Sequence, residues 1–271
     1  MPAHALTVDL IALFAVALYL AAAGALARPL LHEGNAPRRI ALLTGTLAVI
    51  LHFAALLLAH RGALDLHFFA ALSLVAAVIA ALTLVVNLAR PVVAALGVIV
   101  FPLAALLLAI DEFLAPPTMP IALDWQIKLH VTLALIAFGV LSIAALLAVL
   151  LAMQERALRA RQFGGWARVL PPLTLTETLM FRLIAAGFVL LTLALLSGVL
   201  FVHNLFAQDL VQKTALSVIA WIVFGVLLIG RAVSGWRGTR AVNLTLLGMI
   251  VLVFAFFGSK FVLEMVLHRG V

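Results

Sequence analysis

Eight long apolar segments dominate this chain and restrict what it can fold into. A membrane-spanning helix needs about 20 mostly apolar residues at a rise of about 1.5 Å per residue. Of the 271 residues, 67% are hydrophobic and only 10% are charged, which fits neither a water-soluble domain nor a disordered chain. We predict spans over Leu6–Ala27, Ile40–Ala59, His67–Leu88, Val92–Ile110, Leu129–Ala152, Leu183–Asn204, Thr214–Gly230 and Val242–Met265.

The expected fold is all-α, a polytopic transmembrane bundle of about eight helices. Most connections between the spans are short, so consecutive helices should pack as antiparallel neighbours. Two connections are longer, over residues 111–126 and 153–182. Neither is large enough to fold alone, and residues 1–271 are therefore expected to form a single integral-membrane domain. In the second connection, Thr174 to Glu177 has the pattern of a capping box that starts the sixth helix.

The distribution of basic residues predicts the orientation, because loops rich in Lys and Arg stay in the cytoplasm. Of the 17 Lys and Arg residues, 12 fall on one side of the predicted spans and 5 on the other. Both termini are therefore predicted outside. The net charge of +7 is attributed to the cytoplasmic loops and to contact with lipid, and no nucleic-acid partner is expected. With no cysteine, a disulfide framework and thiolate metal sites are excluded.

Three histidines lie within or at the ends of apolar segments. An ionisable side chain at membrane depth is costly, so each is a functional-site hypothesis. His52 lies inside the second span with no polar neighbour between residues 49 and 58. His130 is near the start of the fifth span and His203 near the end of the sixth. The predicted orientation puts all three in the outer half of the membrane.

Two interpretations of these histidines stay open. Each can be a neutral or solvated imidazole that only makes hydrogen bonds, as is ordinary between membrane helices. Alternatively, two imidazoles can coordinate a haem iron from opposite faces while apolar helices cover the macrocycle, and for His52 an ion-relay role is also open. On this second interpretation we predict His130 and His203 as axial ligands of haem iron, with His52 next. Zinc is disfavoured, since no thiolate or carboxylate partner sits close in sequence.

Little else in the sequence predicts chemistry. The sequence contains no GxSxG, Walker or HExxH motif and no paired carboxylate array, so we expect no enzyme activity. Secondary transport ranks lowest, because no acidic residue is predicted near mid-membrane. Lys260 and Glu264 are spaced for a local ion pair. Gly187 and Gly198, eleven apart, are expected to permit close helix contact.

A set of short motifs in the C-terminal third carries a resemblance to a known family. These motifs are Pro172-Leu173, Glu177, Phe181-Arg182, Gly187-Phe188, Leu190 to Leu193, Ser197-Gly198, Ile219 to Trp221, Gly235 to Ala241 and Phe257-Gly258. The set resembles the cytochrome c assembly family of membrane haem-handling proteins, with a signature region over about residues 170–265. Val202 to Phe206 looks most like the short, eight-span inner-membrane branch, which is YpjD-like and akin to HemX.

The resemblance implies a bundle that binds haem through histidines and delivers it for cytochrome c maturation. His130 resembles the family's external histidine before the signature region, and His268 resembles the one after it. His52 resembles a histidine buried in an early span. The implied location is a bacterial inner membrane with both termini periplasmic. The implied partners are the lipid bilayer and components of cytochrome c maturation.

Two departures from the family pattern motivate an alternative function. Between Gly198 and Lys213, where the family has a tryptophan-rich loop, this chain has no tryptophan. The family's second buried histidine should fall where this chain has Ile229, Gly230 and Arg231. The alternative is a structural or regulatory membrane subunit that assists an ion transporter without haem.

Overall fold

The computed structural model describes residues 2–31, 38–59, 65–89, 94–116, 123–161, 172–201, 208–258 and 261. All regular secondary structure in these ranges is helical. The helices are α1 (Pro2–Leu31), α2 (Arg38–Ala59), α3 (Phe68–Ala89), α4 (Ala94–Phe113), α5 (Trp125–Arg159), α6 (Leu173–Phe201), α7 (Gln208–Ser234), α8 (Thr239–Val253) and the π-helix η3 (Phe254–Gly258). Eight are long and apolar enough to cross a membrane, which confirms the predicted all-α transmembrane fold.

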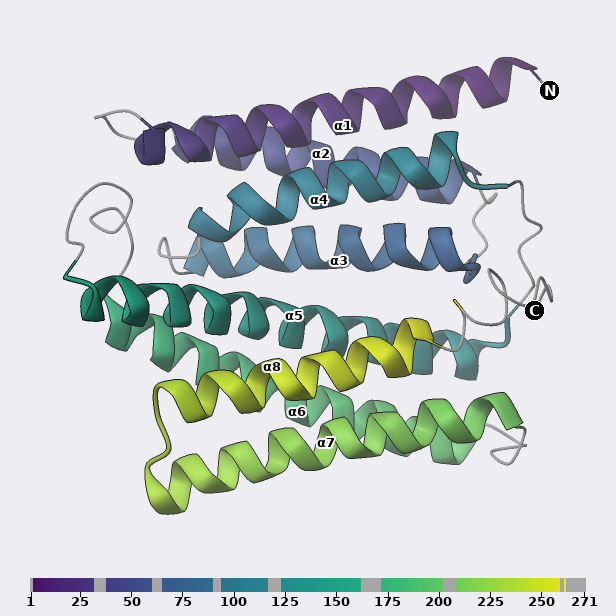
Figure 1. The fold of residues 1–271 in the computed structure, drawn as a ribbon. Coiled ribbons are helices and arrows are strands. Elements are labelled where there is room, and N and C mark those ends of the chain that lie inside the picture. Colours follow the sequence, from purple (N-terminus) through teal and green to yellow (C-terminus); the bar gives the residue numbers. More distant parts are fainter. Residues whose placement is uncertain are drawn as a thin grey trace. The chain divides into compact units, whose positions relative to one another are not determined.

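The helices group into two compact units. In the N-terminal unit, α1 and α3 each pack against α2 and α4. In the C-terminal unit, α5 and α7 each pack against α6 and α8. Within each unit consecutive helices run in opposite directions (Figure 1), so each unit is an up-and-down four-helix bundle. The expectation of one integral-membrane domain over the whole chain stays a prediction, as does the location of the termini.

Small residues at heptad spacing form the interior of the N-terminal unit. The buried positions of α1 advance in alternating steps of four and three, through Val8, Ala12, Ala15, Tyr19, Ala22 and Leu26. Those of α2 follow the same pattern through Ala41, Gly45, Ala48, His52 and Ala55. Such stripes of small side chains let membrane helices approach closely. Tyr19 and His52 are the two large polar members of these stripes.

Two glycines permit the close contact between α5 and α6 in the C-terminal unit. A Cβ atom added at Gly187 would lie 2.6 Å from Leu141 side-chain atoms. One added at Gly198 would lie 3.1 Å from Cε1 of His130. Both glycines therefore face α5, which confirms the packing role expected from their spacing.

The predicted capping box at the start of α6 is wrong. The helix begins at Leu173, and the amides of Leu175 and Thr176 donate to the carbonyl of Pro172 at 3.0 and 3.1 Å. Thr174 is thus already inside the first turn, where its carbonyl accepts a hydrogen bond from the Thr178 hydroxyl at 2.7 Å. The Glu177 carboxylate binds two arginines instead of a backbone amide.

Candidate functional site

His52 lies at the centre of a buried polar network that joins three helices of the N-terminal unit. Its Nδ1 atom is 3.2 Å from the hydroxyl of Tyr19 on α1, and its Nε2 atom is 3.0 Å from the hydroxyl of Ser73 on α3. All three side chains are fully buried. The Tyr19 ring meets the imidazole edge to face and also contacts Phe101 of α4. Both ring nitrogens of His52 are therefore engaged, as expected of a histidine bonded to neighbouring helices.

Replacing Ser73 by alanine is expected to lower the free energy of unfolding by about 1 kcal/mol, because one nitrogen of a buried imidazole loses its partner. Equilibrium unfolding in mixed micelles measures this loss. Thr83→Val is the matched control, since Thr83 is buried on the same helix and its hydroxyl donates to the Ile79 carbonyl of its own helix. Equal stability of the two variants would contradict the bridging role of Ser73.

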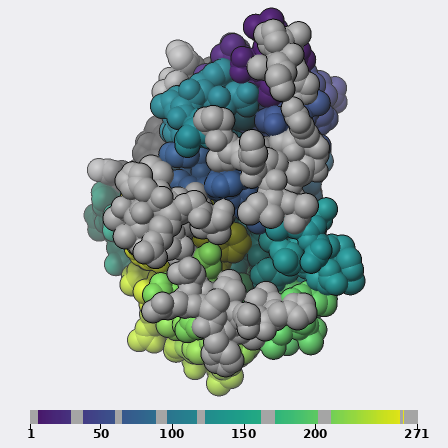
Figure 2. Space-filling view, turned by 90° about the vertical axis from the view of Figure 1, so that its right-hand side faces the viewer, coloured from purple at the N-terminus to yellow at the C-terminus, as the bar shows by residue number. Residues whose placement is uncertain are grey.

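His130 lies between α5 and α6 in the C-terminal unit, near the end at which α5 begins. Figure 2 views the helices from that end. The Nδ1 atom of His130 is 3.0 Å from the hydroxyl of Ser197, and the imidazole lies against the backbone at Gly198. The Ala194 backbone also approaches the imidazole, whereas no side chain among the described residues hydrogen-bonds Nε2 of His130. Nδ1 is therefore anchored by a side chain of the protein, and Nε2 has no side-chain partner in that set.

Aromatic side chains flank this part of the C-terminal unit. Trp125 and Phe201 stand at the ends of α5 and α6 with ring centroids 6.0 Å apart, about one helical turn beyond His130 and Ser197. Further along α5, Phe138 packs on Phe256 of η3 at 4.9 Å. A π-helix turn such as η3 often marks a functional position. The C-terminal unit thus has one aromatic pair on each side of His130 along α5.

Two of the four predicted haem ligands cannot be placed in the structure. His203 and His268 lie outside the described residues, as do Lys260 and Glu264. His52 belongs to the N-terminal unit and His130 to the C-terminal unit. In the described part of the chain no group of three or more His, Asp or Glu side chains lies close enough to hold a metal ion. Within that part, His52 and His130 are each a single imidazole with hydroxyl partners.

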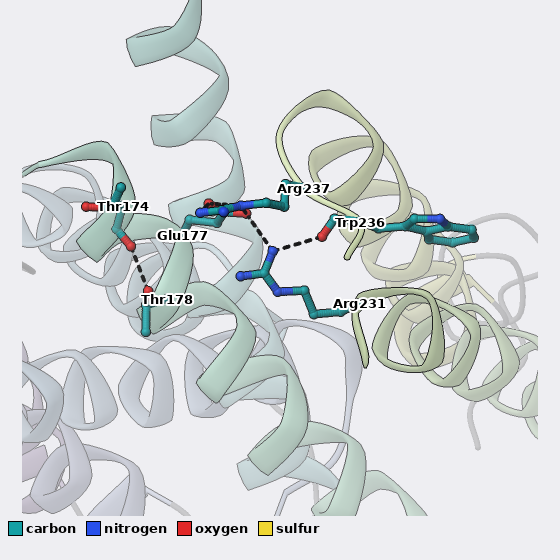
Figure 3. Close-up of polar contacts among 6 residues, drawn as sticks. All are labelled: Thr174, Glu177, Thr178, Arg231, Trp236 and Arg237. Atoms are coloured by element: carbon teal, nitrogen blue, oxygen red, sulfur yellow. Dashed lines mark hydrogen bonds and ion pairs between the residues drawn. The ribbon is translucent and has the colours of Figure 1, made fainter. Parts of the chain in front are cut away.

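A buried carboxylate joins α6 to α7 and to the turn after α7 (Figure 3). Arg231 donates to Glu177 at 3.2 Å, and Arg237 donates to both carboxylate oxygens at 3.1–3.3 Å. Arg231 also donates to the Trp236 carbonyl at 3.1 Å and lies over the Phe181 ring at 4.6 Å. Hydrogen bonding to Glu177, with its negative charge, raises the pKa of Arg237 above its usual value. The cluster fixes one end of the bundle.

The turn between α7 and α8 depends on glycine. Gly235 and Gly238 have φ values of +63° and +58°, a backbone region that glycine enters without steric cost. Between them, the Trp236 amide donates to the Gly230 carbonyl at 3.2 Å, and its indole covers Gly230 so closely that a Cβ there would lie 2.3 Å from the ring. This turn places the Trp236 carbonyl beside Arg231 and the Arg237 guanidinium beside Glu177. These four residues form what we call the Glu177 cluster.

Gly230→Ala is expected to lower the free energy of unfolding by about 1–3 kcal/mol, because the indole of Trp236 must move. Gly225→Ala on the same helix is the control. A Cβ there would meet Phe188 at 3.4 Å, an ordinary contact, so better helix propensity is expected to raise stability by up to about 1 kcal/mol. Unfolding in mixed micelles checks both signs. A stabilising Gly230→Ala would refute the described packing.

Residues 39–267 match the family described as Cytochrome C assembly protein. The chain belongs to the cytochrome c assembly protein family. The match covers residues of both units, from α2 to beyond η3, and leaves α1 outside, whereas the short motifs recognised in the sequence lie in the C-terminal third.

Two relatives illustrate what this family member is similar to. Inner membrane protein YpjD of Escherichia coli strain K12 is 39% identical over 137 residues, or 51% of this chain and 52% of that protein. Cytochrome c biogenesis protein CcsA of Chlamydomonas reinhardtii is 24% identical over 180 residues, or 62% of this chain and 49% of that protein. The matched part is thus about half the length of these curated relatives. No solved structure matches the chain.

In this family member, several motif residues have structural roles that sequence patterns did not predict. Glu177 binds arginines 54 and 60 residues away. Arg231, one of the three residues in the stretch where the resemblance implies a second buried histidine, binds Glu177. Tyr19 and Ser73 were not predicted as partners of His52. One signal was present for Tyr19, the single tyrosine of the chain, which lies inside an apolar segment.

Proposed function

We propose that this protein is a non-enzymatic haem-handling protein of the inner membrane that serves cytochrome c biogenesis, with His130 as one axial ligand of haem iron. Membership of the cytochrome c assembly family supports the biogenesis role. The names of the relatives, an inner membrane protein and cytochrome c biogenesis proteins, support the location and the process.

The arrangement at His130 carries the proposal. A ligating histidine characteristically bonds the protein through one ring nitrogen and presents the other to the metal. His130 has this arrangement, with Nδ1 bonded to Ser197 and Nε2 without a side-chain partner among the described residues. Haem, when bound, supplies an iron that accepts an imidazole nitrogen. The protein's part is to hold and orient that imidazole between α5 and α6.

The other predicted ligands rank behind His130. His203 remains the preferred second ligand, and His268 follows from the family resemblance. Iron ligation by His52 would break its hydrogen bond with Tyr19 or with Ser73. The residues around His52 therefore fit a structural role, in which the imidazole links neighbouring helices, better than the role of an iron ligand. In this proposal the termini are periplasmic, and the partners are the bilayer and components of cytochrome c maturation.

Titration of the purified full-length protein with haem in detergent tests the proposal. We expect a saturable Soret band and a reduced spectrum of histidine-ligated haem. Absence of protein-bound haem would refute the haem-handling function. Stoichiometric capture of an ion transporter by such a haem-free protein would favour the alternative of a structural or regulatory subunit.

A further inference from the structure

We infer that Ser197 is a positioning residue that fixes the tautomer of His130 and so directs Nε2 to accept iron. This inference rests on the proposed function, in which His130 is an axial ligand. It starts from two contacts of a single hydroxyl group. Ser197 Oγ is 2.8 Å from the carbonyl oxygen of Ala194 and 3.0 Å from Nδ1 of His130.

The position of one proton decides the direction of both hydrogen bonds. A serine hydroxyl has one proton to donate and two lone pairs with which to accept. A carbonyl oxygen only accepts, so the contact at 2.8 Å places the Ser197 proton toward Ala194. Ser197 Oγ then has only lone pairs to offer to His130. Nδ1 of His130 must therefore carry the proton and donate to Ser197.

The consequence falls on the other ring nitrogen. A neutral imidazole has one protonated and one unprotonated nitrogen. With the proton held on Nδ1, Nε2 has a free lone pair, which is the form that binds a metal. The network Ala194–Ser197–His130 thus selects the ligating form before any haem arrives. Because Ser197 is buried on α6, water does not compete freely for this hydrogen bond.

Helix geometry supports the same assignment. Gly198 lets the imidazole approach the α6 backbone, since a Cβ atom there would lie 3.1 Å from Cε1 of His130. Ser197 belongs to the last part of α6, and its bond to Ala194, three residues earlier, fixes the hydroxyl within its own helix. The acceptor that meets His130 is therefore oriented by local α6 geometry.

Nitrogen NMR of the haem-free protein tests the tautomer directly. The full chain is labelled with ¹⁵N-histidine, and the His130 signals are assigned by comparison with His130→Gln. We expect a protonated Nδ1 and an unprotonated Nε2 in the wild type. Ser197→Ala should lose this preference and Ser197→Thr should keep it, because threonine retains the hydroxyl. A wild-type His130 with its proton on Nε2 would overturn the inference, whatever the result with haem.

Haem affinity provides the second readout. Loss of a residue that orients a metal-binding histidine typically weakens metal binding about 10–100-fold. We expect a loss of this size in Ser197→Ala, with recovery in Ser197→Thr. Ser142→Ala is the matched control, because Ser142 is buried in the same unit and its hydroxyl donates to Phe138 of its own helix. Unchanged affinity and an unchanged tautomer in Ser197→Ala would overturn the positioning role. If the wild-type NMR result holds but haem does not bind, the proposed function fails and the tautomer assignment stands.

Discussion

Replacing His130 by alanine is expected to weaken haem binding by more than about 100-fold, beyond the roughly 10–100-fold expected for loss of an orienting neighbour. The reason is that alanine removes the nitrogen that would ligate iron. It also leaves the Ser197 hydroxyl bonded to Ala194 alone. Haem titration of the purified variant, followed by the Soret band, measures the effect.

The control for this loss is a histidine with a partner of its own. His67, at the start of α3, bonds the buried carboxylate of Asp65 through its ring and its backbone amide. His67→Ala is expected to bind haem as the wild type does. Equal haem affinity of His130→Ala and the wild type would remove His130 from the ligand set.

The second large effect is expected for stability. Glu177→Ala should lower the free energy of unfolding by about 2 kcal/mol, because two guanidinium groups lose the carboxylate that they share. Most of the lost free energy is expected from the pair with Arg231, whose side chain is less exposed than that of Arg237, 31% compared with 59%. The Glu177 side chain itself is only 4% exposed. A fully buried pair would lose about 3–5 kcal/mol, so partial exposure of Arg231 reduces the expected value. Equilibrium unfolding in mixed micelles provides the measurement.

Glu155→Ala is the matched control for the carboxylate. Glu155 lies 3.9 Å from Arg159, whose side chain is 78% exposed, and it accepts a hydrogen bond from Thr239 at 3.4 Å. Such exposed pairs contribute less than about 1 kcal/mol, so this variant should remain close to the wild type. If Glu177→Ala were no less stable than Glu155→Ala, the Glu177 cluster would not be what holds α6 to the turn after α7.

Sequence patterns predicted the helices because span formation depends on local properties. Eight apolar segments were long enough to cross a membrane, and each corresponds to one helix of the structure. Helix ends were less accurate. The predicted sixth span began at Leu183, whereas α6 begins at Leu173, because polar residues such as Glu177 find partners on α7 and continue the helix.

The partners of the site residues depend on packing between helices that are distant in sequence. His52 meets Tyr19 from 33 residues away and Ser73 from 21. His130 meets Ser197 from 67 residues away. The heptad spacing of the small residues indicates which face of α1 or α2 is buried, yet it does not identify the opposite side chain. The sequence therefore predicted candidate histidines, and the fold distinguishes a fully bonded His52 from a half-bonded His130.

Chemical rescue by imidazole is the measurement that tests iron ligation by His130 most directly. His130→Gly leaves space for a free imidazole, whereas His130→Leu fills that space with an apolar side chain. After haem and imidazole are added, unbound haem is removed by gel filtration and the reduced spectrum of the protein fraction is recorded. We expect imidazole to restore bound, histidine-type haem in His130→Gly and not in His130→Leu. Haem retained equally by both variants without imidazole would contradict it.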